Sequence, residues 1–257
     1  MFKKNPKITI ITVVKNGEKY LEKNIKSLMN QSYKNYEHII IDGSSTDKSM
    51  EIAEKYKDQI YKIISEKDNG LYDAMNKGIK NANGDIIGIL NSDDYYNEGA
   101  LEIVKNYFEN ESGIDFLFGS VIKYKHMYGY YPWRIYWTFN FYTAHSVGFF
   151  IKKESQLKVG FYNTKYKFSA DYDLFYRMIV KSKMKGMATT KNEIMGHFRT
   201  DGFSSRIKYI DYLNENTLIR LDNGQNKFIV KMIHFFRYIK RIKIILKQKK
   251  ISTKYLP

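Results

Sequence analysis

The chain has 257 residues and no cysteine, which excludes disulfides, thiol catalysis and zinc sites built on cysteine. Its 23 tyrosines and 16 phenylalanines are too many for a disordered chain. The formal net charge is +16, and residues 206–257 carry +10 of it, with 13 basic and 3 acidic side chains. A basic end of this kind is typical of proteins that meet a polyanionic surface, either a membrane or a nucleic acid.

The first half of the chain alternates apolar runs with amphipathic segments. Residues 8–14 read ITIITVV, which predicts a strand buried on both faces. The following segments predict a helix across 20–29, a strand at 38–41, a helix from 46 or 47 to 56, a strand at 60–64, a helix at 71–82 and a strand at 85–90. Strands and helices that alternate with short links predict right-handed βαβ units and a mainly parallel sheet.

Acidic and amide side chains follow three of the predicted strands. Asn16 follows the first, Asp42 the second, and Asp93 with Asp94 the strand at 85–90. Ligands of parallel sheets bind beyond the carboxyl ends of the strands, so the pattern predicts a binding rim. Each of these residues taken alone is also typical of a turn or a helix cap.

No glycine-rich phosphate loop follows any predicted strand. Neither Gly-x-Gly-x-x-Gly nor Gly-x-x-x-x-Gly-Lys-Ser/Thr occurs there, which removes the main support for NAD enzymes and P-loop NTPases. A nucleotide bound at the rim would need another source of positive charge. A divalent cation on carboxylates, Mg²⁺ or Mn²⁺, is the expected source, because it takes oxygen ligands and bridges phosphates.

Several separated blocks of the sequence resemble family-2 glycosyltransferases. They are ITIITVVKNGEKYLEKNIKSLMNQSYKNYEHIIIDGSSTD, EKDNGLYDAMNKGIKNANGDIIGILNSDD, AHSVGFFIKKE, FSADYDLFYRM and HFRTDGFSS, and they cover about residues 8 to 206 in the family's order. The resemblance implies an α/β, Rossmann-like A-type glycosyltransferase fold with a mixed, mainly parallel central sheet. It implies a catalytic domain over 1–206, with a nucleotide-binding half (1–94) and an acceptor half (95–206), followed by a basic helical region at 207–257.

The resemblance also implies which residues bind a nucleotide-diphosphate sugar. Asp42 reads the base, Asp68 lies in the loop that closes over the nucleoside, and Asp93 faces the ribose or the sugar. Asp94 is the ligand of Mn²⁺ or Mg²⁺; adjacent carboxylates repel unless a cation or a proton relieves them, and the alternative for the pair is a solvated turn. The remaining residues border the nucleotide or close over the diphosphate: Thr12, Val13, Val14, Asn16, His197 and Arg199.

Asp171 matches the catalytic base of the family. Inverting sugar transfer needs a carboxylate that takes the proton of the acceptor hydroxyl while its oxygen attacks the anomeric carbon. Residues 171–181 predict a helix, so Asp171 stands in its first turn, where Asp171 or Asp173 could instead serve as a helix cap. His145 resembles a histidine that lines the acceptor pocket, with a structural histidine as the alternative.

Two regions point to further surfaces. The aromatic side chains crowded between 128 and 142 could stack on sugars, anchor at a membrane interface or pack a long loop. Residues 227–250 contain nine Lys and Arg and no acid, with apolar side chains at three- and four-residue steps. This pattern predicts an amphipathic helix that binds an anionic membrane surface, that packs on the domain or that pairs with another subunit. No nucleic-acid partner is expected, because no recognised binding module accompanies the charge.

Together these features predict an inverting, metal-dependent glycosyltransferase. The expected donor is a nucleotide-diphosphate sugar, a UDP-sugar, and the expected acceptor is a hydroxyl of a glycan or lipid-linked molecule in bacterial surface-polysaccharide or glycolipid synthesis. The alternative is a non-catalytic nucleotide-sugar or polyanion-binding protein with a degenerate transferase fold. Residues 1–7 lead straight into the first strand without a signal-like apolar region, so we expect a cytoplasmic protein, peripheral on the cytoplasmic face of the membrane.

Overall fold

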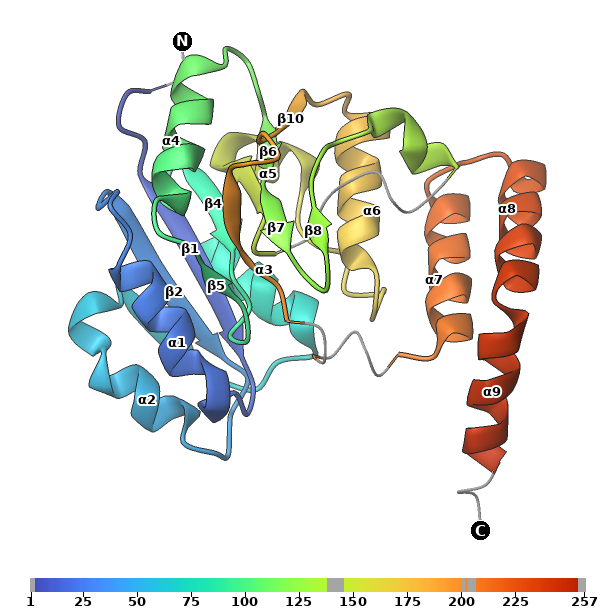
Figure 1. The fold of residues 1–257 in the computed structure, drawn as a ribbon, viewed down its shortest axis with the longest axis horizontal. Helices are drawn as coiled ribbons and strands as arrows, with labels where there is room; N and C mark the ends of the chain where they lie inside the picture. Colours follow the sequence, from blue (N-terminus) through green and yellow to red (C-terminus); the bar gives the residue numbers. More distant parts are fainter. Residues whose placement is uncertain (1–2, 138–145, 200–201, 203–206, 254–257) are drawn as a thin grey trace.

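A seven-stranded sheet forms the centre of the molecule in a computed structural model that describes residues 3–137, 146–199, 202 and 207–253, without the side chains of 249–253 (Figure 1). The strand order is β10-β6-β9-β4-β1-β2-β3. Strand β9 runs antiparallel to its neighbours β4 and β6, and the other pairs are parallel. The predicted mixed, mainly parallel sheet is therefore confirmed. The bounds are β1 Ile8–Val14, β2 Tyr36–Asp42, β3 Lys62–Ser65, β4 Ile86–Ile89, β6 Phe116–Phe118, β9 Phe149–Lys152 and β10 Gly186–Ala188.

Helices cover both faces of this sheet, which is why β1 is buried along its whole length. Apolar side chains of α1, α2 and α4 pack on one face of the sheet, and those of α3 and α6 pack on the other. The bounds are α1 Glu18–Met29, α2 Ser49–Lys55, α3 Leu71–Asn81, α4 Ala100–Asn110, α5 Lys153–Val159 and α6 Ala170–Tyr176. Short turns of helix add η1 Lys57–Gln59, η2 Pro132–Tyr136 and η3 Arg177–Lys181.

A smaller sheet beside the central one joins two distant parts of the sequence. Its order is β5-β11-β7-β8, with bounds Tyr95–Tyr96, Ile194–His197, Ser120–Ile122 and His126–Met127. Strand β5 pairs antiparallel with β11, so Tyr95 lies opposite His197. The approach is close at Gly196, where a Cβ would stand 2.3 Å from the carbonyl oxygen of Tyr95. The sheet thereby brings the block around residue 197 beside the Asp93-Asp94 turn.

The helices of the C-terminal region lie at the edge of the molecule opposite α1 and α2 (Figure 1). They are α7 (Tyr209–Asp222), α8 (Lys227–Lys240) and α9 (Ile242–Thr253). Helix α7 packs against α6, while α8 and α9 both contact α7. The single helix predicted over 227–250 is interrupted at Arg241, whose φ of −116° and ψ of 13° break the helix. Among the described residues, no helix has the length and apolar character needed to span a membrane.

Candidate active site

The carboxyl ends of three strands meet at one edge of the central sheet. Val14 pairs with Asp42 at the ends of β1 and β2. The Ser92 amide donates to the carbonyl of Val13 (3.2 Å), so the turn after β4 that carries Asp93 and Asp94 lies beside the end of β1. The strand ends singled out in the sequence therefore form a shared rim.

Asp42 ends β2, and Asp68 lies on the loop that approaches the residue after it, Gly43. Asp42 is fully buried, and its carboxylate accepts from the Ser45 amide (3.1 Å) and the Ser65 hydroxyl (2.7 Å). Asp68 accepts from the Gly70 amide (3.0 Å). A Cβ on Gly43 would stand 2.3 Å from Asp68 Oδ2, so the absence of a side chain at 43 lets the two loops touch.

Asn16 is the exposed one of the four residues predicted to border the nucleotide. It has a φ of 52° and its Oδ1 accepts from the Thr46 amide (2.8 Å), which fixes the loop after β2. Val13 and Val14 are buried in β1, and the Thr12 hydroxyl points into the interior, where it donates to Asn24 Oδ1 (3.1 Å). The structure thus places the side chains of these three residues in the interior of the sheet and not on its surface.

The acidic pair divides into a buried and a partly exposed carboxylate. Asp94 is 2% exposed; its Oδ1 accepts from the Arg199 amide (2.9 Å) and its Oδ2 from the Ser146 hydroxyl (3.1 Å). Burial, reinforced by the charge of Asp93, raises the pKa of Asp94 to about 8. Asp93 Oδ2 lies 3.8 Å from Nη1 of Arg199. A cation at this turn would favour the ionised form of Asp94 and offset its repulsion with Asp93.

The donor set at this turn fits Mn²⁺ or Mg²⁺. Carboxylate oxygens are the ligands that hard divalent cations prefer. Among the described residues no group of three or more His, Cys, Asp and Glu side chains could hold a metal. Asp93 and Asp94 would supply the protein ligands, and the other positions would fall to diphosphate oxygens and water, the usual arrangement for Mg²⁺.

Positively charged and aromatic side chains surround the pair. The ring of His197 stacks on Tyr95, with centroids 4.7 Å apart, and Lys23 Nζ lies 3.4 Å from the centroid of Tyr95. The guanidinium of Arg199 lies 3.9 Å from the ring centroid of Tyr20. Burial, reinforced by Lys23, lowers the pKa of His197. The predicted residues Asp93, Asp94, His197 and Arg199 are therefore brought together, whereas the α1 side chains beside them carried no signal in the sequence.

A buried polar network is hydrogen-bonded to the backbone of the acidic turn. Asn24 is fully buried and donates through Nδ2 to the backbone carbonyls of Asn91 (2.9 Å) and Asp94 (3.0 Å). Its Oδ1 accepts from Thr12, whose Oγ1 lies 2.9 Å from His38 Nε2. Burial lowers the pKa of His38 to about 3, so that ring stays neutral at ordinary pH. The network ties the turn to the first two strands.

Asp171 and Asp173 have different surroundings although both stand in the first turn of α6. Asp171 is partly exposed, and its Oδ1 accepts from the Tyr72 hydroxyl (3.1 Å), which α3 presents just after the Asp68 loop. Asp173 is 3% exposed and accepts from Arg177 Nε (2.9 Å) and Asn223 Nδ2 (2.8 Å). Asp173 is thus an internal anchor, and Asp171 is the carboxylate that a substrate can reach.

Glu215 of α7 holds the segment that leads into α6. Its carboxylate accepts from the backbone amides of Lys167, Phe168 and Ser169, each at 2.7 Å. No sequence pattern indicates this contact, which joins the basic C-terminal region to the helix that bears Asp171. His145 lies outside the described residues; the next residue, Ser146, contacts Asp94 as described above.

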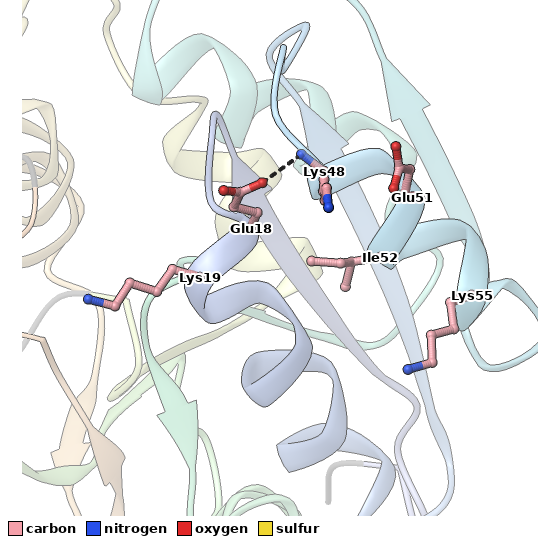
Figure 2. A pocket seen from close by; sticks show the side chains of 6 residues that line it. All are labelled: Glu18, Lys19, Lys48, Glu51, Ile52 and Lys55. Carbon is pink, nitrogen blue, oxygen red and sulfur yellow. Dashed lines mark hydrogen bonds between the residues drawn. The ribbon is translucent and has the colours of Figure 1, made fainter.

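A separate hollow of about 670 Å³ lies between α1 and α2 (Figure 2). It is lined by Glu18, Lys19, Lys48, Glu51, Ile52 and Lys55. Two acidic and three basic side chains nearly balance there, and the Lys48 amide donates to Glu18 Oε2 (2.9 Å). None of the predicted site residues lines it, so the rim of the central sheet is the candidate site.

Solved structures share this architecture. S. aureus TarS residues 1–349 in complex with UDP-GlcNAc align over 89% of this chain and 70% of that chain, with a TM-score of 0.65 and 16% identity. The mannosyltransferase PcManGT from Pyrobaculum calidifontis, in complex with GDP-Man and Mn²⁺, aligns over 98% of this chain and 76% of that chain, with a TM-score of 0.64 and 14% identity. The fold is the A-type glycosyltransferase fold.

Sequence comparison places the chain in a family. The model of glycosyl transferase family 2 matches residues 9–182. An uncharacterized glycosyltransferase of Haemophilus influenzae is 44% identical over 105 residues, which are 40% of this chain and 42% of that relative, so the match spans under half the relative's length. The chain belongs to glycosyl transferase family 2.

Proposed function

We propose that this protein transfers a sugar from a nucleotide-diphosphate donor, a UDP-sugar, to an acceptor hydroxyl with inversion at the anomeric carbon and with the help of Mn²⁺ or Mg²⁺. One observation carries the proposal. The chain presents an acidic pair beside Arg199 and, on α6, a partly exposed carboxylate, Asp171, whose partner Tyr72 stands at the start of α3 just after the Asp68 loop. Binding of a nucleotide sugar alone needs only the acidic pair and the rim, so the further accessible carboxylate of Asp171 favours a catalytic site.

The rim offers a distinct contact for each part of the donor. The carboxylate of Asp42 would accept from the base, with Asp68 over the nucleoside and Asp93 on the ribose or sugar. Arg199 and His197 would face the diphosphate. The metal, held by Asp94, would neutralise the diphosphate charge when bound. Two structural neighbours bind UDP-GlcNAc and GDP-Man, the latter with Mn²⁺, which supports a nucleotide-sugar donor and a divalent metal here.

Asp171 would act as the general base. As the acceptor oxygen bonds to the anomeric carbon, its proton passes to the Asp171 carboxylate, and the bond from that carbon to the diphosphate oxygen breaks. Attack from the side opposite the diphosphate inverts the configuration. Arg199, already beside Asp93, would stabilise the charge that develops on the departing diphosphate.

The proposed acceptor is a glycan or a lipid-linked molecule used in bacterial surface-polysaccharide or glycolipid synthesis, at the cytoplasmic face of the membrane. His145, by its resemblance to an acceptor-side histidine, would line that part of the pocket. Exposed rings support a carbohydrate acceptor, because aromatic faces stack on sugar rings. They are Tyr128 and Tyr131.

A donor panel tests this function. Full-length protein is incubated with UDP- and GDP-sugars in Mn²⁺ or in EDTA, and nucleoside diphosphate release and thermal shift are measured. The proposal expects one UDP-sugar to stabilise the protein and to release UDP in Mn²⁺, with both effects lost in EDTA and in Asp94→Ala. Binding of a nucleotide sugar without turnover, with and without candidate acceptors, would favour the non-catalytic alternative.

A further inference from the structure

The C-terminal helix α8 has two apolar faces, and only one of them is packed. Val230 and Ile233 are buried toward the domain, and His234 Nδ1 lies 2.9 Å from Thr217 Oγ1 of α7. The side chains at 228, 232, 235, 236 and 239 stand at three- and four-residue steps and are exposed, with Phe228 at 77%, Phe235 at 59% and Phe236 at 62%. This spacing places them in one continuous stripe on the outer side of the helix.

Positive charge borders this outer stripe along α8 and α9, two helices that carry no acidic residue. Residues 223–257 contain no Asp or Glu. Exposed basic side chains flank the stripe on α8 and continue along α9: Lys227, Lys231, Lys240, Arg241, Lys243 and Lys247. A large exposed apolar patch rimmed by polar side chains marks an interaction site. Here the rim has a single sign, so the partner must be anionic.

An aromatic turn lies next to the start of α8. The Tyr136 carbonyl of η2 accepts from Arg220 Nη1 (2.7 Å) and from Gln225 Nε2 (3.0 Å), so η2 is bonded to the link between α7 and α8. Beside that carbonyl, the rings of Trp133 and Trp137 are 61% and 50% exposed. Tryptophan is enriched where proteins meet the membrane–water interface.

We propose that the outer face of α8 and α9 docks on the surface of an anionic lipid bilayer, with the helices in the plane of the interface. The phenyl rings would enter the headgroup boundary while the lysines and arginines meet lipid phosphates. Helix α8 is about 21 Å long from its 14 residues and packs one side on α7, so its outer side is available to lie along a flat surface. The two helices form the outer edge of the molecule (Figure 1).

A second copy of the chain is a poorer occupant of the same face. Two copies meeting there would bring two rows of lysine and arginine together with no acid to pair them, and like charges in contact oppose association. An anionic bilayer matches both the apolar stripe and the sign of its border. This inference rests on residues outside the sheet rim and stands whether or not the proposed transferase chemistry is correct.

Vesicle flotation with the full chain tests the proposal. Vesicles of phosphatidylcholine alone are compared with vesicles that also contain phosphatidylglycerol, at low and high salt. We expect binding to the anionic vesicles that falls as salt is raised, since headgroup attraction is screened within about 8 Å at physiological ionic strength. Equal binding to both kinds of vesicle, or to neither, would overturn the proposal.

Two variants and a control locate the contact. Phe235→Ser with Phe236→Ser should lower partitioning by about tenfold per ring, and Lys231→Gln with Lys240→Gln by about fivefold per charge. Leu157→Ser, which changes a side chain 57% exposed on α5, should leave binding unchanged. All changed side chains are exposed, so circular dichroism should report an intact fold. Unchanged partitioning of the phenylalanine variant would refute docking on lipid. So would an unmodified protein that does not bind vesicles but forms a dimer that the phenylalanine variant loses.

Discussion

Replacement of Glu215 by alanine tests how the C-terminal region supports the candidate base. The Glu215 carboxylate accepts three backbone N–H groups at 2.7 Å, all from the segment directly before α6. Hydrogen bonds to a charged group contribute about 1.5–3 kcal/mol each. Because Glu215 is only partly buried, water can replace part of that contribution in the variant. We therefore expect the free energy of unfolding to fall by about 3–5 kcal/mol, less than the full sum of three bonds.

The change should reach catalysis through the position of Asp171. The bonded residues 167–169 set the start of α6, and Asp171 stands in its first turn. We expect kcat to fall at least tenfold in Glu215→Ala, while KM for the donor changes little because the donor contacts lie on other loops. Glu215→Gln keeps one carbonyl acceptor and should give an intermediate loss of both stability and kcat.

Chemical unfolding and steady-state kinetics on the same preparations measure the two effects. Asn214→Ala is the matched control, because Asn214 is an exposed neighbour on α7 and its loss should change neither quantity. If Glu215→Ala matches this control in stability, the three hydrogen bonds contribute nothing. If it loses stability but keeps its kcat, α7 does not position the base.

Other contacts of the site give further expected outcomes. Asn24→Ala removes the hydrogen bonds to the carbonyls of Asn91 and Asp94, so it should lower the free energy of unfolding by about 2–4 kcal/mol. It should also weaken Mn²⁺-dependent binding of the nucleotide sugar, measured by calorimetry. Unchanged affinity would show that this network does not position the acidic turn. His38 has a folded pKa of about 3, below its unfolded value of 6.5, so its contribution is complete above pH 6.5 and is lost as the pH falls toward 3. Urea unfolding should show a loss of about 2 kcal/mol between pH 7 and pH 5 that is absent in His38→Gln. Asp173→Asn should lower the melting temperature while turnover persists, since its carboxylate is paired with Arg177; abolished turnover in a stable variant would make Asp173 the base instead.

Local sequence patterns predicted the first half of the fold well because those helices and strands are determined mainly by the apolar periodicity and the turn residues of their own segments. ITIITVV forms β1 over the predicted residues, and α3 ends one residue before the predicted limit. The strand predicted at 60–64 is observed as Lys62–Ser65, because Ile60 ends the preceding turn and is buried beside α2. The helix predicted at 171–181 is observed as an α-helix that continues as a π-helix from Arg177 to Lys181. The strands of the small sheet have only two to four residues, too few to show the two-residue alternation of a strand. They form because they pair with neighbouring strands that are distant in the sequence.

The candidate site was predictable where chemistry is carried by acidic side chains at strand ends. The rim carries Asp42, Asp68 and the acidic pair Asp93 and Asp94. Arg199 and His197 lie beside that pair. The inward turn of the Thr12 hydroxyl depends on Asn24 of another element. The support from Glu215 depends on a residue 46 to 48 positions away. Such contacts arise from tertiary packing, and no spacing within the sequence indicates them.

The central claim is that Asp171 takes a proton during sugar transfer, and Asp171→Asn tests it most directly. An amide keeps the shape of the side chain and its bond to the Tyr72 hydroxyl but cannot accept the proton. With the UDP-sugar identified by the donor panel and saturating Mn²⁺, we expect the Kd for the donor to match that of the unmodified protein. Turnover should fall by about 10²- to 10⁴-fold, the usual contribution of a general base. Turnover within a few-fold of the unmodified protein at equal donor affinity would contradict the account.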